Sequence, residues 1–180
     1  MQTQCEWFET ELTTDEALVV IEPYFEALLE QFHDQGLTRI TRVVLVVTDE
    51  EEDGMRDTPR HFAGCLESGD EILVAPELAD LPPETIEGIL AHELGHAADF
   101  LYPAWFYQGR GGMTMRNRED YSDKEWRRFL RSWKDRDDDR VEMSADQIAE
   151  LVTGERIGYA GPCMLQTLGG GGARRPRGLR

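Results

Sequence analysis

The chain has 180 residues and a mass of 20.6 kDa, which is enough for one domain with a sizeable core. Its hydrophobic content of 40% is typical of globular proteins and excludes wholesale disorder. No apolar run exceeds five residues, as at Val43–Val47, and the N-terminal residues are neither basic nor apolar. We therefore expect no membrane span, no signal peptide and a cytoplasmic location.

The charge is distributed unevenly along the chain. Residues 1–109 carry four arginines and 24 acidic residues, a net charge of −20, whereas residues 110–180 carry 15 basic and 12 acidic residues, a net charge of +3. The acidic half repels phosphates, so we expect no nucleic-acid partner. It is either a solubilising surface or a patch that attracts a basic protein partner.

The three cysteines lack metal-binding spacing and favour a reducing compartment (Cys5, Cys65 and Cys163).

The first half of the chain predicts one long helix and a few strands. Residues 13–36 begin with cap-like residues, show helical apolar spacing and end at Gly36, with Pro23 either kinking the helix or starting its second part. Residues 40–48 predict a buried strand. Residues 61–66 and 71–74 predict a β-hairpin around a glycine-containing turn. The acidic run at 49–54 is predicted to be a solvated loop.

The second half predicts three helices and a basic tail. One helix begins near Pro82–Pro83 and ends before Pro103, a second begins at Ser122, and a third spans about 138–152 and stops at Gly154. Residues 108–118 are rich in Gly and Arg and predict a loop, either a simple surface loop or a lid over a site. We expect one domain over residues 1–168 and a flexible tail over 169–180, either solvated or bound to the acidic half.

The central helix carries the motif His92-Glu93-Leu94-Gly95-His96. Because His92 and His96 are four residues apart, both imidazoles project from one helix face and can bind the same metal ion. Glu93 lies about 100° around the helix, where it can contact a metal-bound water without binding the metal itself. This spacing is typical of zinc hydrolases with a glutamate as general base.

A catalytic zinc site needs a third protein ligand, and Glu142 is the best candidate. It lies on one face of the last helix together with Ala145, Asp146 and Ala149, and the two alanines allow close approach to the central helix. Asp146, one turn after Glu142, can then accept a hydrogen bond from the non-ligating nitrogen of a histidine. The alternative is an ordinary amphipathic helix with two surface acids.

His92-Glu93-x-x-His96 followed by Glu142-x-x-Ala145-Asp146 resembles the gluzincin branch of zinc metallopeptidases, and the small intracellular ImmA/IrrE-like members are most similar. The resemblance implies an α+β, zincin-like domain with a small mixed or antiparallel sheet on the two site helices. It implies one Zn²⁺ held by His92, His96 and Glu142, with Glu93 as general base, and a protein or peptide substrate. It also implies that strand 71–74 is the sheet edge along which the substrate lies.

Other interpretations stay open at this point. Gly64-Cys65-Leu66 vaguely resembles the cysteine segment of peptide deformylases, which would make Cys65 the third ligand, although a core cysteine is the simpler interpretation. Asp99 is expected to be a hydrogen-bond acceptor near the site or a surface acid. A non-catalytic acidic interaction protein with a structural or vestigial metal site is the third possibility. Six residues are candidates for stabilising an oxyanion (Tyr102, Tyr107, Tyr121, Tyr159, His33 and His61).

Overall fold

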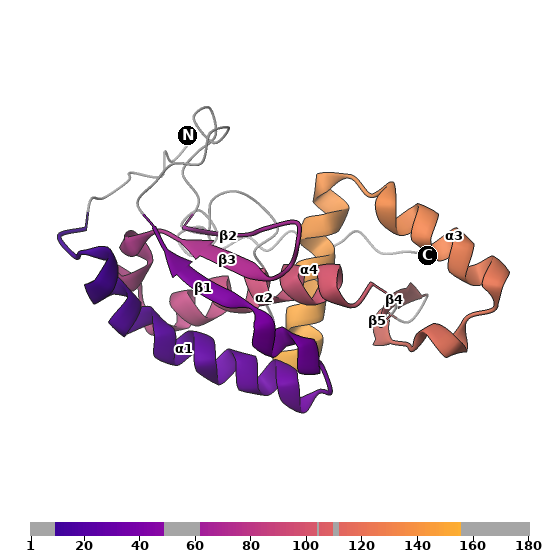
Figure 1. The fold of residues 1–180 in the computed structure, drawn as a ribbon, viewed down its shortest axis with the longest axis horizontal. Coiled ribbons are helices and arrows are strands. Elements are labelled where there is room, and N and C mark those ends of the chain that lie inside the picture. The colour runs from indigo at the N-terminus through magenta and orange to yellow at the C-terminus, as the bar shows by residue number, and fades with distance from the viewer. Residues whose placement is uncertain (1–9, 49–61, 104, 110–111, 156–180) are drawn as a thin grey trace, which may run out of the picture.

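The computed structural model describes residues 10–48, 62–103, 105–109 and 112–155, which form a small α+β domain (Figure 1). The helices are α1 (Thr14–Asp34), α2 (Pro83–Leu101), α3 (Asp123–Lys134) and α4 (Asp138–Thr153), with short 3₁₀ helices at Thr38–Arg42, Pro76–Asp80 and Arg118–Asp120. The strands are β1 (Val44–Val47), β2 (Ala63–Cys65), β3 (Glu71–Val74), β4 (Phe106–Gly109) and β5 (Gly112–Met115). The coarse expectation of an α+β fold is confirmed.

The three-stranded sheet has the order β1–β3–β2, so β3 is its central strand. It pairs in parallel with β1 and in antiparallel with β2, and the turn between β2 and β3 contains Gly69 with a positive φ of 73°. The hairpin predicted at 61–74 is therefore confirmed. The prediction that strand 71–74 is the sheet edge is wrong, because both of its sides are already paired. Among the described residues, the edges are β1 and β2.

Helix α1 begins at a complete capping box, in which the Thr13 hydroxyl accepts from the Glu16 backbone N–H and the Glu16 carboxylate accepts from that of Thr13. The helix runs without interruption through Pro23, which excludes the alternative of a second helix start there and leaves the kink as a prediction. The predicted strand over 40–48 is only half right, since its first residues belong to the 3₁₀ helix Thr38–Arg42 and β1 begins at Val44.

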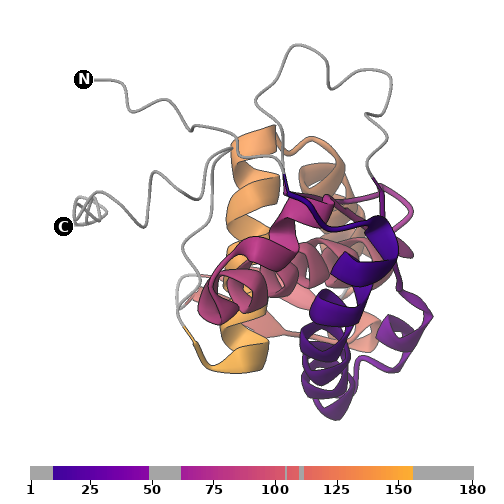
Figure 2. The same ribbon diagram turned by 90° about the vertical axis from the view of Figure 1, so that its left-hand side faces the viewer.

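The core lies between the sheet and the two long helices. Helix α1 contacts β1, and α2 contacts both β2 and β3, as the two views of the ribbon show (Figures 1 and 2). Ile72 and Val74 of β3 are buried toward this layer, next to Phe32 of α1 and Leu90 of α2 in the same hydrophobic cluster. Helix α2 is buried along most of its length because α1 and α4 also pack on it.

The region predicted as a loop at 108–118 is mostly a two-stranded hairpin, in which β4 pairs in antiparallel with β5. This corrects the prediction, which rested on the density of glycines. The hairpin and α3 lie together at one end of the molecule, away from the three-stranded sheet (Figure 1). Helix α3 begins at a capping box formed by Ser122 and Glu125, and none of its residues is fully buried.

Helix α4 ends as predicted at Gly154, which has a positive φ of 73°. The acidic run at 49–54, the domain boundary at residue 168 and the basic tail at 169–180 lie outside the described residues. Within the described part of the chain, no helix is both long and apolar enough to cross a bilayer.

Candidate metal centre

Helix α2 holds both histidines and the glutamate of the predicted motif in a buried position. His92, Glu93 and His96 are 6%, 8% and 8% exposed, respectively. Buried imidazoles and carboxylates are costly unless they have partners, so these side chains need hydrogen bonds, charges or a metal nearby. The neighbouring helix supplies those partners.

Helix α4 crosses α2 at very short range, at Gly95 of α2 and Ala145 of α4. A Cβ atom placed on Gly95 would lie 2.3 Å from the carbonyl oxygen of Ala145 and 2.9 Å from its carbonyl carbon. Only glycine at this position lets the two backbones approach so closely. Since Glu142 and Asp146 flank Ala145 by one turn or less, this contact presents both carboxyl groups to the histidines of α2.

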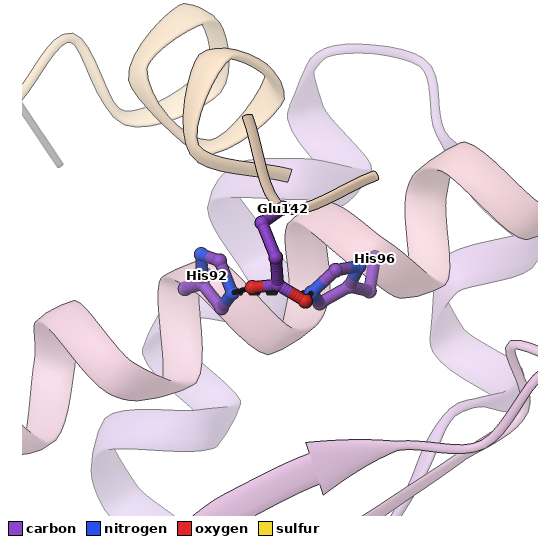
Figure 3. A group of neighbouring side chains, drawn as sticks. All are labelled: His92, His96 and Glu142. Atoms are coloured by element: carbon purple, nitrogen blue, oxygen red, sulfur yellow. Dashed lines mark hydrogen bonds and ion pairs between the residues drawn. The ribbon is translucent and has the colours of Figure 1, made fainter. Parts of the chain in front are cut away.

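The side chains of His92, His96 and Glu142 converge on one point (Figure 3). Glu142 Oε2 lies 2.9 Å from His92 Nε2, and Glu142 Oε1 lies 3.4 Å from His96 Nε2. The two Nε2 atoms are 3.1 Å apart. One ligand atom from each residue lies within 4.8 Å of the others, and this is the one such group among the described residues.

These distances fit a tetrahedral metal site. Metal–nitrogen and metal–oxygen bonds of about 2.1 Å at tetrahedral angles place neighbouring ligand atoms about 3.4 Å apart. The two Nε2 atoms lie 3.1 Å apart, and each has a Glu142 oxygen nearby, Oε2 at 2.9 Å from His92 and Oε1 at 3.4 Å from His96, so the observed separations lie at or somewhat below that value. The group is also open on one side, because the Glu142 side chain is 39% exposed whereas the two imidazoles are buried. His92, His96 and Glu142 can therefore hold a metal ion with one position left for a further ligand.

Asp146 fixes the orientation of His92, as the sequence predicted. Its Oδ1 atom lies 2.7 Å from His92 Nδ1. An ionised carboxylate only accepts hydrogen bonds, so Nδ1 of the imidazole donates to Asp146, and Nε2 is the nitrogen that faces Glu142 and His96. Figure 3 shows that same nitrogen pointing at the Glu142 carboxylate.

The same contacts control ionisation in the metal-free cluster. Burial lowers the pKa of His92, but hydrogen bonds to Asp146 and Glu142 outweigh it and raise that pKa to about 10. Burial raises the pKa of Glu142, but its hydrogen bonds with His92 and His96 reverse the effect and bring it well below its ordinary value. A metal ion bound at this site therefore displaces a proton from His92 Nε2.

Glu93 lies between α2 and strand β2. Its carboxylate accepts a hydrogen bond from the backbone N–H of Cys65. Burial raises the pKa of Glu93, and the positive charges of His92 and His96 act in the opposite direction without cancelling it. Glu93 is thus a buried carboxyl group with a raised pKa beside the cluster, held by the edge strand of the sheet.

Cys65 does not join the metal-ligand group among the described residues. Its Sγ atom lies 3.4 Å from the Leu66 carbonyl oxygen, and it packs against the hydrophobic core. Burial, together with the negative charges of Glu93 and Asp70, raises the pKa of the Cys65 thiol to about 12, which disfavours the thiolate that a metal would bind. The backbone of Cys65 contributes to the site, rather than its sulfur.

Asp99 is neither a surface acid nor a member of the metal-ligand group. It is 3% exposed and forms a 2.6 Å ion pair with Arg136, and its other oxygen accepts a hydrogen bond from the indole of Trp133. Arg136 also donates to the Ser144 hydroxyl of α4. This network fastens the end of α3 and the start of α4 to α2, which supports the helix that carries Glu142.

The described oxyanion candidates differ in whether their polar atoms are paired, and the Tyr121 hydroxyl is buried without a hydrogen-bond partner among the described residues. The Tyr102 hydroxyl accepts from the Arg39 backbone N–H. Tyr107 and Tyr121 pack against each other, and Tyr121 also packs on α3. His33 is half-exposed on α1, while His61 and Tyr159 lie outside the described residues. The roles of Gly95 and Arg136 were not predicted from the sequence, although a glycine in the middle of a buried helix often indicates close backbone approach.

Comparisons with known proteins add no relative. No protein-family model, no curated protein and no solved structure matches this chain.

Proposed function

We propose that this chain is a zinc-dependent metallopeptidase of the gluzincin type, with a zincin-like fold. The observation that carries the proposal is the convergence of His92, His96 and Glu142, from two helices, within 4.8 Å. The donor set of two imidazoles and one carboxylate is typical of catalytic zinc, which keeps three protein ligands and one open position. Glu93, one residue after the first ligand, completes the pattern expected from the sequence.

The chemistry assigns separate tasks to the surrounding residues. When bound, zinc supplies a Lewis acid that activates water and polarises a peptide carbonyl. Glu93 is the general base, because it follows the first ligand on the buried helix and burial raises its pKa above the ordinary value, which makes its carboxylate a better proton acceptor. It accepts the proton of the attacking water and delivers it to the leaving amine. Asp146 keeps the Nε2 lone pair of His92 directed at the metal.

We place the substrate backbone along β2 rather than β3. Among the described residues, β2 is one of the two edge strands, and its Cys65 N–H contacts Glu93, so a chain paired with β2 would pass beside the general base. An extended peptide adds readily to such an edge through backbone hydrogen bonds. A protein or peptide is therefore the substrate that suits this arrangement, and its side-chain preference is left to experiment.

Two variants separate metal binding from catalysis. Glu142→Ala should lose stoichiometric zinc, whereas Cys65→Ala and the matched control Glu150→Ala, on the same helix, should keep it. Glu93→Gln should keep zinc but lower the cleavage of a mixture of synthetic peptides by about 10²-fold or more, with Glu87→Gln on α2 as the matched control. Metal content is measured by elemental analysis and cleavage by mass spectrometry.

Each outcome bears on the proposal. Zinc retained in Glu142→Ala but lost in Cys65→Ala would replace the gluzincin assignment with the deformylase-like one. Zinc bound stoichiometrically with no cleavage in the unmodified protein would favour a structural metal site. Absence of zinc from protein purified without chelators would overturn the proposal as a whole.

A further inference from the structure

A second feature of the molecule lies away from the metal centre, between α1, α2 and the end of α4. It is a cavity of about 290 Å³, and none of its lining residues belongs to the metal-ligand group or is Glu93 or Asp146. That volume is at the small end of ligand pockets, so it suits a few side chains rather than a large cofactor. The lining includes residues of three helical segments that are far apart in the sequence.

The cavity has an acidic rim and an apolar floor. Glu84 and Glu87 of α2 and Glu155, just beyond α4, supply three carboxylates, all of them exposed. Small residues of α2, Gly88 and Ala91, form part of the wall together with Leu28 and Tyr24 of α1. A carboxylate rim over an apolar wall with an aromatic ring suits an arginine, whose aliphatic stem can pack while its guanidinium pairs with carboxylates or stacks on the ring.

The described stretches that supply most of the cavity wall carry no basic side chain other than histidine. Residues 10–36 and 62–103, which include α1, β2, β3 and α2, contain no lysine or arginine. The same stretches contain 16 acidic residues. The cavity therefore lies in a strongly negative region, which favours a basic occupant electrostatically.

The chain itself carries a matching segment. Residues 156–180 contain five arginines and no acidic residue, and four of these arginines fall within residues 174–180. This segment follows directly after Glu155, which lines the cavity. The intervening residues 156–173 include a run of four glycines, and a backbone of that length can bridge any distance up to about 60 Å. The arginines are thus tethered within reach of the cavity at a high effective concentration.

We propose that the arginine-rich segment 174–180 docks in the acidic cavity between α1, α2 and the end of α4 of the same chain. The occupant is the chain's own segment because its charge is complementary, its tether is long enough, and the volume admits arginine side chains from it. A basic segment of a second copy, or of another protein, is an alternative that the experiment distinguishes. The proposal does not depend on the metal centre or on peptidase activity.

The test compares backbone amide NMR spectra of the full-length protein with those of a variant in which arginines 174, 175, 177 and 180 are changed to serine. We expect amide shift changes that concentrate on the α1 and α2 residues lining the cavity. They should disappear when salt rises from about 0.05 M to about 0.5 M, because screening weakens exposed ion pairs. Introducing Glu84→Gln and Glu87→Gln should abolish the difference between the two spectra.

The matched control introduces Glu71→Gln and Glu77→Gln, which change the charge equally but do not line the cavity. This control should preserve the spectral difference. Three results would overturn the proposal. The shift changes could be absent, they could spread over the whole protein, or they could respond equally to both pairs of substitutions. Shift changes that fade on dilution would overturn docking within one chain and assign the contact to a second copy.

Discussion

Substituting Gly95 by alanine tests the close helix crossing on which the metal centre depends. The added Cβ atom would lie 2.3 Å from the Ala145 carbonyl oxygen, where ordinary contact begins at 3.4 Å. All three nearest atoms belong to the Ala145 backbone, so no side chain can move aside. Helix α4 must therefore shift away from α2 by about 1 Å, and overpacking of this kind costs about 1–3 kcal/mol.

The shift carries Glu142 with it. Because Glu142 already lies 2.9 and 3.4 Å from the two imidazole nitrogens, a further displacement of about 1 Å takes its carboxylate out of the geometry that a shared metal requires. We expect Gly95→Ala to weaken zinc binding by about 10–100-fold, similar to loss of a supporting interaction. Competition with a chromogenic chelator measures the affinity, and urea unfolding measures the stability.

The sign of the stability change in Gly95→Ala shows whether the added Cβ atom clashes with α4. Alanine has a higher helix propensity than glycine, so without the clash the substitution would stabilise α2 by about 1 kcal/mol. Gly64→Ala in β2 is the matched control, since an added Cβ there meets nothing within 4 Å, and it should leave zinc affinity unchanged. A Gly95→Ala protein that is more stable and binds zinc normally would refute the described crossing of α2 and α4.

Three further predictions concern residues around the site. Asp146→Ala should lower zinc affinity about 10–100-fold by competition assay, since the imidazole loses its orienting acceptor, and unchanged affinity would exclude that role. Asp99→Ala should lower the free energy of unfolding by about 3 kcal/mol in urea, because it leaves Arg136 buried without its 2.6 Å partner; a loss below about 1 kcal/mol would contradict a structural ion pair. The third prediction uses a protein in which the other two cysteines are changed to serine. Cys65 should react with a disulfide reagent at pH 8 far more slowly in the folded protein than in urea. The reason is that burial raises the pKa of the Cys65 thiol to about 12, so that about 10⁻⁴ of it is thiolate at this pH. Equal rates in the two states would show that the thiol is not held in this environment.

The sequence by itself placed the helices with good accuracy, because their ends carry local chemical signals. Thr13 and Ser122 form the capping boxes that begin α1 and α3, and Gly154 ends α4 with the positive φ that glycine tolerates best. The histidine spacing of α2 is also local, since residues four apart on a helix share a face whatever surrounds them. The pairing of these histidines with Glu142 was a prediction from residue type and order, and the tertiary structure brings the three together.

Strand order and the supporting contacts were decided by the tertiary structure. Strand β3 is central because β1, which is distant in sequence, pairs with it in parallel, and periodicity within 71–74 contains no information about that partner. The hairpin β4–β5 formed from a glycine-rich stretch because pairing satisfied its backbone. Two supporting contacts also join residues that are distant in the sequence. The ion pair of Asp99 with Arg136 spans 37 positions, and the contact of Gly95 with Ala145 spans 50 positions. Local spacing fixes which side chains share a face, but only packing fixes which faces meet.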